Sequence, residues 1–145
     1  YARFGTALSA AGDVNGDGCD DLIVGAPSRG IDETGNENDL SEPALIFLGT
    51  PSGIGDYWAW RIEEGQAVTD FASSVGAAGD VDGDGLDDVL VGAPEFKVGG
   101  QKCGKAFLYL GTNAHPLPYG LYLPMVMKYN TAVNAATRLA EPRPQ

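Results

Sequence analysis

The sequence predicts an all-β fold made of two repeated units that are like blades of a β-propeller. Glycine accounts for 21 of the 145 residues, about twice its usual share of ~7%, and glycine is a poor helix former. The apolar runs are short and end at glycine. The same order of runs also occurs twice. These three observations favour short strands joined by glycine turns over a helix bundle.

An internal repeat carries this prediction. Phe4–Pro27 and Phe71–Pro94 are identical at 15 of 24 positions without a gap, at an offset of 67 residues. Ala44–Thr50 matches Ala106–Thr112 at an offset of 62, so the first copy has five extra residues before this block. The extra length falls in the polar stretch Ser28–Pro43, which is predicted to be a surface loop, where added residues cost little.

Each copy is predicted to hold three or four short strands. Three of them recur in the same order: a strand of small residues, an apolar strand that ends at Gly-Ala-Pro, and an apolar strand that ends at Gly-Thr. They are Phe4–Ala11, Leu22–Val24 and Leu45–Leu48 in the first copy, and Phe71–Ala78, Val89–Val91 and Phe107–Leu110 in the second. Between the copies, Tyr57–Ile62 has the period of a half-buried strand, because Trp58 and Trp60 alternate with Ala59 and Arg61.

The domain organisation follows from the repeat. Residues 1–112 are expected to form a two-repeat region, with the copies at about 4–50 and 71–112 and the strand-containing segment 51–70 between them. Residues 113–145 form a tail that repeats nothing and carries a net charge of +2, against −13 for the region before it. Two blades do not close a propeller, because propellers have ~4 to 8. The chain is therefore either a fragment of a longer propeller or a protomer that assembles into a ring.

The loop between the first two strands of each copy has the pattern of a metal-binding loop. Oxygen-bearing residues recur at positions 1, 3, 5 and 9, with a glycine at position 6. The predicted ligands are Asp13, Asn15, Asp17, the carbonyl of Cys19 and Asp21 in the first copy, and Asp80, Asp82, Asp84, the carbonyl of Leu86 and Asp88 in the second. Asp20 and Asp87, at position 8, are expected to point away from the ion.

Calcium is the ion that this pattern favours, at two ions per chain. Calcium takes six to eight oxygen ligands at ~2.3 to 2.6 Å in a flexible shell, whereas magnesium needs a strict octahedron and zinc prefers cysteine and histidine. An EF-hand would close with Glu at position 12, but Val24 and Val91 occupy that position inside apolar runs. The predicted sites therefore lie between strands, not helices. Aspartate and glycine also favour plain turns, but nine of the twenty acidic residues crowd these two loops.

These motifs are similar to the FG-GAP repeat. Phe4-Gly5, the aspartate loop and Gly25-Ala26-Pro27 fit it in the first copy. The second copy has Phe71-Ala72 where Phe-Gly is expected, and keeps Gly92-Ala93-Pro94 and its loop. FG-GAP repeats build the N-terminal propeller of integrin α subunits and related extracellular proteins. The resemblance covers about 1–112 and implies a propeller-like fold, an extracellular or cell-surface location, and calcium that is structural rather than catalytic.

Several classes of function are disfavoured. The net charge of −11 argues against a nucleic-acid partner, which needs clustered Lys and Arg. No apolar run approaches the ~18 residues of a membrane span, and no signal-like segment follows Tyr1, so we expect a soluble chain without membrane insertion, mature or excised from a longer one. His115 has no nucleophile pattern near it, and we predict no catalytic residues.

The leading hypothesis is a non-enzymatic, calcium-binding module for adhesion or recognition of a protein or glycan ligand. The alternative is an accessory propeller segment of a secreted or surface enzyme, such as a phospholipase or a polysaccharide-degrading enzyme, with its catalytic residues outside this chain. Cys19 and Cys103 are expected to be free thiols or to pair between molecules. In the tail, Thr131–Glu141 is predicted to form a short helix that stops at Pro142.

Overall fold

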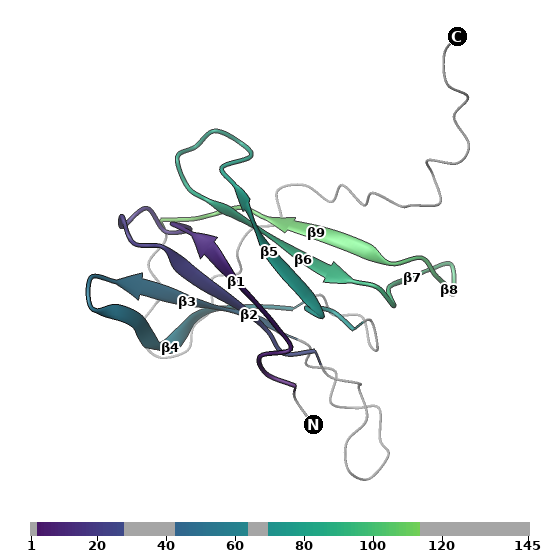
Figure 1. Cartoon of the computed structure of the whole chain (residues 1–145). Helices are drawn as coiled ribbons and strands as arrows, with labels where there is room; N and C mark the ends of the chain where they lie inside the picture. The colour runs from purple at the N-terminus through teal and green to yellow at the C-terminus, as the bar shows by residue number, and fades with distance from the viewer. Residues whose placement is uncertain (1–2, 28–42, 64–69, 114–145) are drawn as a thin grey trace.

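The computed structural model describes residues 3–27, 43–63 and 70–113, which form nine β-strands (Figure 1). No helix occurs in these three segments, and all strand pairs in them are antiparallel, which confirms the all-β prediction. The loop 28–42, the predicted helix at 131–141 and His115 lie outside the described residues.

The first sheet is a four-stranded meander in which each strand pairs with the next along the chain. It consists of β1 (Ala7–Gly12), β2 (Asp21–Gly25), β3 (Ala44–Thr50) and β4 (Gly53–Ile62). The segment between the copies, predicted as a strand at Tyr57–Ile62, is therefore the outer strand of the first sheet. A β-bulge lies between Ala10 and Gly12, next to the loop that joins β1 to β2.

The second sheet repeats this order with three strands. It contains β5 (Ser74–Gly79), β6 (Asp88–Ala93) and β9 (Lys105–Tyr109), and a small hairpin of β7 (Lys97–Val98) and β8 (Gln101–Lys102) lies between β6 and β9. Its bulge, between Ala77 and Gly79, is at the same place as in the first sheet. The sequence repeat is thus a structural repeat. The hairpin had no signal in the apolar pattern, because both of its strands are exposed.

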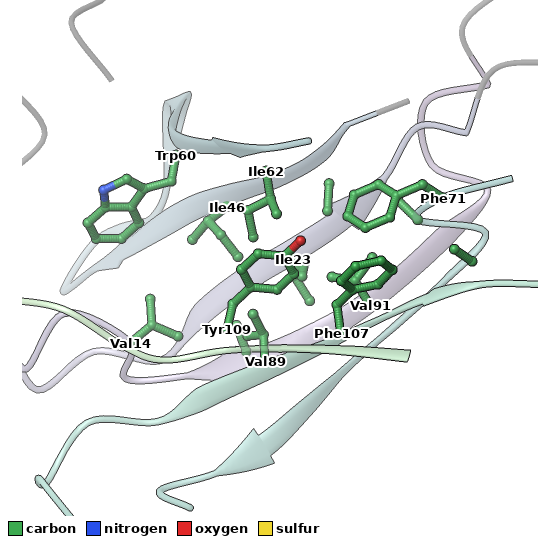
Figure 2. Close-up of a cluster of buried hydrophobic side chains, with 14 residues drawn as sticks. Val14, Ile23, Ile46, Trp60, Ile62, Phe71, Val89, Val91, Phe107 and Tyr109 are labelled. Atoms are coloured by element: carbon green, nitrogen blue, oxygen red, sulfur yellow. The ribbon is translucent and has the colours of Figure 1, made fainter. Parts of the chain in front are cut away.

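The two sheets pack together through different faces and share one core. Ile23, Ile46 and Trp60 pair across β2, β3 and β4 on one side of the first sheet, which we call the Ile face. Phe107 and Tyr109 on β9 lie on the facing side of the second sheet, which we call the Phe face (Figure 2). These five side chains are all buried. Since the two faces belong to different repeats, neither repeat has a complete core alone.

The Phe-Gly and Gly-Ala-Pro segments meet at this contact. Phe4-Gly5 and Phe71-Ala72 precede the strands as turns, so the first strands start three residues later than predicted. Gly5 and Ala72 both have a positive φ, of 84° and 61°, which explains why glycine is expected there. A Cβ at Gly25 would overlap the backbone oxygen of Ala72. The Gly-Ala-Pro glycine of one repeat therefore allows the turn of the next repeat to pack against it.

Candidate metal centres

The first carboxylate of each loop organises the loop backbone. Asp13 Oδ1 accepts hydrogen bonds from the Gly16 N–H at 2.7 Å and the Asp17 N–H at 3.0 Å, and its Oδ2 accepts one from the Gly18 N–H at 2.8 Å. Gly16 and Gly18 have φ values of 76° and 86°, which side chains with a Cβ rarely adopt. The alternating glycines thus permit the turn that wraps three N–H groups around one carboxylate.

The second loop has the same arrangement. Asp80 Oδ1 accepts from the Gly83 N–H at 2.7 Å and the Asp84 N–H at 3.1 Å, and its Oδ2 accepts from the Gly85 N–H at 2.9 Å. Each distance is within 0.1 Å of its equivalent in the first loop. The repeat in sequence therefore produces two loops of the same shape.

The position-9 carboxylate of the first loop is buried at the start of β2. Asp21 Oδ2 accepts a hydrogen bond from the Val14 N–H at 2.9 Å, and its Oδ1 accepts one from the Gly49 N–H at 2.7 Å. Burial raises the pKa of Asp21 above its usual value, while the bonds from Gly49 and Val14 oppose that rise and the charges of Asp17 and Asp13 add to it. Asp21 therefore fastens the loop to the end of β3.

The second loop is fastened in the same way. Asp88 is fully buried, and it accepts hydrogen bonds from the Val81 N–H at 2.8 Å and the Gly111 N–H at 2.9 Å. A carboxylate oxygen has two lone pairs, so an oxygen that accepts one N–H can still face a cation. These two carboxylates are fixed by the sheets, and the rest of each loop can fold around them.

Three carboxylates converge in the second loop. One oxygen each of Asp80, Asp82 and Asp88 lie within 4.8 Å of one another. Asp80 and Asp82 are exposed and Asp88 is buried, so the group opens toward solvent on one side. Asp84, a fourth predicted ligand, is not in this group, and its Oδ1 accepts the Leu86 N–H at 3.0 Å.

The first loop has an amide where the second has Asp82. The side chain of Asn15 accepts from the Asp17 N–H at 2.9 Å and donates to Asp17 Oδ2 at 2.8 Å. Asp17 Oδ1 in turn accepts the Cys19 N–H at 2.9 Å. Partial burial, with the charges of Asp17, Asp13 and Asp21, raises the pKa of the Cys19 thiol. The carbonyls of Cys19 and Leu86 stay predicted ligands.

Sequence reasoning missed the role of Asp87. The Asp87 side chain is half-buried, and its Oδ2 accepts the Asp13 N–H of the other loop at 2.9 Å. The Asp87 N–H also donates to the Asp13 carbonyl at 3.0 Å, and the Thr112 N–H donates to the Val14 carbonyl at 2.8 Å. The only sequence signal was that both copies have aspartate at this position.

The tryptophans, the Arg61 side chain and the cysteines are the other side chains of note in the described residues. Trp60 is buried in the core and Trp58 is half-buried on the same strand. The side chain of Arg61 pairs with Glu63. Both cysteines are free and half-buried. No membrane-spanning helix was found among the described residues.

The family model that matches this chain is the FG-GAP repeat, and the relatives named here are integrin alpha chains. The family model described as "FG-GAP repeat" matches residues 4–39 and 71–109, one match per repeat and together more than half of the chain. Integrin alpha-PS3 of Drosophila melanogaster is 36% identical over 99 residues, 64% of this chain and 8% of that protein. Human Integrin alpha-10 is 41% identical over 95 residues, 63% and 8% of the two chains. Integrin alpha-4 of Xenopus laevis is 33% identical over 110 residues, 74% and 10%. The chain spans a tenth or less of these relatives.

Proposed function

This chain belongs to the FG-GAP repeat family, and we propose that it is a calcium-binding, non-catalytic repeat module of an extracellular or cell-surface protein that acts in adhesion or protein recognition. The similarity to integrin alpha chains supports the adhesion class. The two-repeat region is proposed to end near residue 112, with 113–145 as a separate tail.

The observation that carries the calcium proposal is the convergence of Asp80, Asp82 and Asp88. Two oxygens that each lie ~2.4 Å from one calcium ion can be at most ~4.8 Å apart, and the three carboxylates meet that limit. Without a cation, three like charges at this range repel by about 1 kcal/mol per pair even at water-like screening. The group therefore fits one hard divalent cation.

Each proposed ion would join two strands of one sheet. Each loop connects the first strand of its repeat to the second. The position-9 carboxylate also accepts a hydrogen bond from Gly49 near the end of β3 in the first repeat, and from Gly111 just past β9 in the second. An ion held by the proposed sets would therefore fix the relative positions of all three strands. The sets are Asp13, Asn15, Asp17, Cys19 carbonyl and Asp21, and Asp80, Asp82, Asp84, Leu86 carbonyl and Asp88. This supports a structural role for calcium.

Isothermal titration of the metal-stripped chain with calcium tests the proposal. We expect two sites in the parent and one in Asp88→Asn, which keeps the shape of the buried side chain but removes its charge. Asp56→Asn, which removes an exposed charge on β4, should keep both sites. A parent that binds no calcium, or an Asp88→Asn variant that still binds two ions, would contradict the assignment.

A further inference from the structure

The one Asn-Gly step of the sequence lies in the first aspartate loop. Asn15 is followed by Gly16, and every other asparagine is followed by a residue that has a Cβ. Asparagine is chemically labile, because the backbone nitrogen of the next residue can attack its side-chain carbon. Glycine hinders this attack least, since it has no Cβ. Asn15 is half-buried and Gly16 is exposed, so water reaches this step.

The native loop holds the two reacting groups on different partners. The Gly16 N–H donates to Asp13 Oδ1 at 2.7 Å. The Asn15 amide is bonded twice to Asp17: its Oδ1 accepts the Asp17 N–H at 2.9 Å, and its Nδ2 donates to Asp17 Oδ2 at 2.8 Å. Ring closure requires the amide to turn its face toward the Gly16 nitrogen, and that N–H to give up its proton. Both changes break hydrogen bonds of the loop, so the folded loop restrains the reaction.

The second loop has the same geometry without the amide. Asp82 and Gly83 occupy the places of Asn15 and Gly16, and the Gly83 N–H also donates to the first carboxylate of its loop at 2.7 Å. Asp82 has no amine to lose. Of the two equivalent loops, the first is therefore the one in which loss of ammonia changes the residue type, and the change would put aspartate at position 3 of both.

We propose that Asn15 is a site of spontaneous deamidation, which the hydrogen bonds of its loop slow and which opening of the loop releases. The Gly16 nitrogen loses its proton and bonds to Asn15 Cγ, while the bond from Cγ to Nδ2 breaks and ammonia leaves with that proton. Water then opens the cyclic succinimide. Cleavage of the new bond between nitrogen and Cγ gives aspartate, and cleavage of the original main-chain bond gives isoaspartate. Water is the only co-reactant, and nothing is oxidised or reduced.

Either product changes the first loop. Aspartate at position 3 replaces the Nδ2 donor by an oxygen, so attraction to Asp17 Oδ2 becomes repulsion between like charges. Isoaspartate adds one carbon to the main chain before Gly16, which displaces the N–H groups that Asp13 gathers. Deamidation is therefore a permanent record of loop opening, and it alters the first candidate metal centre while it leaves the second intact.

Peptide mapping by mass spectrometry of the full chain measures the reaction, because replacement of NH2 by OH changes the mass of one peptide. EGTA is present throughout, so the result does not depend on calcium binding. Conversion of Asn15 should be about tenfold slower in the folded chain than in urea, since hydrogen bonds of the loop must open first. Asn113, which is exposed and followed by alanine, is the internal control and should differ less between the two conditions.

Two variants locate the restraint. Asp17→Ala removes the acceptor of Asn15 Nδ2 and should speed conversion in the folded chain by about fivefold, as expected for one lost hydrogen bond. Asp84→Ala, at the same position of the second loop, is the matched control and should leave the Asn15 rate unchanged. Circular dichroism checks that both variants are folded.

Three results would overturn the assignment. The first is an Asn15 that remains an amide in urea. The second is an Asn15 in the parent that converts as fast in the folded chain as in urea, a comparison that needs no variant. The third is an equal rate in folded Asp17→Ala and Asp84→Ala, which would mean that the contacts of Asp17 do not restrain the amide.

Discussion

The aspartates of the two loops have three distinct structural roles, which depend on their position in the loop. Asp13 and Asp80 gather backbone N–H groups and shape the turns. Asp21 and Asp88 are buried and tie each loop to its third strand. Asp87 reaches the neighbouring repeat, where it accepts the Asp13 N–H. The role of each carboxylate follows from the N–H groups that surround it, and a substitution should have an effect specific to that role.

Asp87→Ala should lower the free energy of unfolding by about 1 to 3 kcal/mol, because it leaves the part-buried N–H of Asp13 without its acceptor. Asp20→Ala is the matched control, since Asp20 has the same loop position but is exposed, and it should change stability by less than about 0.5 kcal/mol. Urea unfolding measures both, in calcium and in EGTA. Because Asp87 is not a proposed ligand, its effect should persist in EGTA; equal stability of the two variants would refute this role.

Gly25→Ala should destabilise the protein by about 1 to 3 kcal/mol, because the added methyl group would overlap the backbone oxygen of Ala72 and force β2 away from the Phe71-Ala72 turn. Gly76→Ala is the control: a Cβ there meets nothing within 4 Å, so it should be neutral or stabilise by up to about 1 kcal/mol. Thermal unfolding of the two variants compares them. A Gly25→Ala variant as stable as the parent would show that the two segments are not held in contact.

At the scale of elements, each aspartate loop is a short connection between antiparallel strands, and the loops of neighbouring repeats touch. The Thr112 N–H, just past β9, bonds to the carbonyl of Val14 in the first loop. A Cβ at Gly111 would crowd Leu86 and the Asp87 carbonyl. The end of one sheet is therefore packed against both loops, so a change in one loop should be felt across the contact.

Removing calcium should lower the melting temperature. An ion that binds only the native state adds RT ln(1 + [L]/Kd), about 2.7 kcal/mol at a hundredfold excess over Kd, and its removal restores the repulsion among Asp80, Asp82 and Asp88. Scanning calorimetry with calcium, with magnesium and with EGTA measures the shift. We expect calcium to raise the midpoint more than magnesium does. Identical midpoints in calcium and EGTA would contradict a structural ion.

At the scale of the molecule, the two repeats are one folding unit because a single buried cluster spans both sheets (Figure 2). Trp60 lies in the first sheet, and Phe107 lies in the second. Because this core is shared, the stability of one repeat should depend on the core residues of the other. The chain is also acidic overall, and the two acidic loops lie side by side at the contact.

Phe107→Ala should lower the unfolding midpoint seen by tryptophan fluorescence, although both tryptophans are in β4 of the first sheet. Loss of a buried phenylalanine costs about 3 to 5 kcal/mol. The fluorescence and circular dichroism transitions should coincide in the parent. Tyr57→Ala, at a residue that is 86% exposed, is the control and should change little. A second sheet that unfolds while the tryptophan signal stays native would show two independent units.

The strand order and the shape of the two loops could be predicted from the sequence because both depend on neighbouring residues. Glycines at fixed positions allow the positive φ values, and Asp13 bonds to N–H groups within five residues of itself. The start of β1 was placed too early, since the turn at Phe4-Gly5 becomes visible only through its φ value.

The packing of one repeat on the other was decided only by the tertiary structure. Val14 and Val81 have the same place in the same motif, yet one is buried and the other is half exposed. Asp20 and Asp87 likewise differ only in what lies opposite them. The local sequence sets the backbone of each repeat, but burial and long-range hydrogen bonds depend on which neighbour covers each face. Because the two repeats have similar sequences, the motif by itself does not distinguish the covered copy from the other.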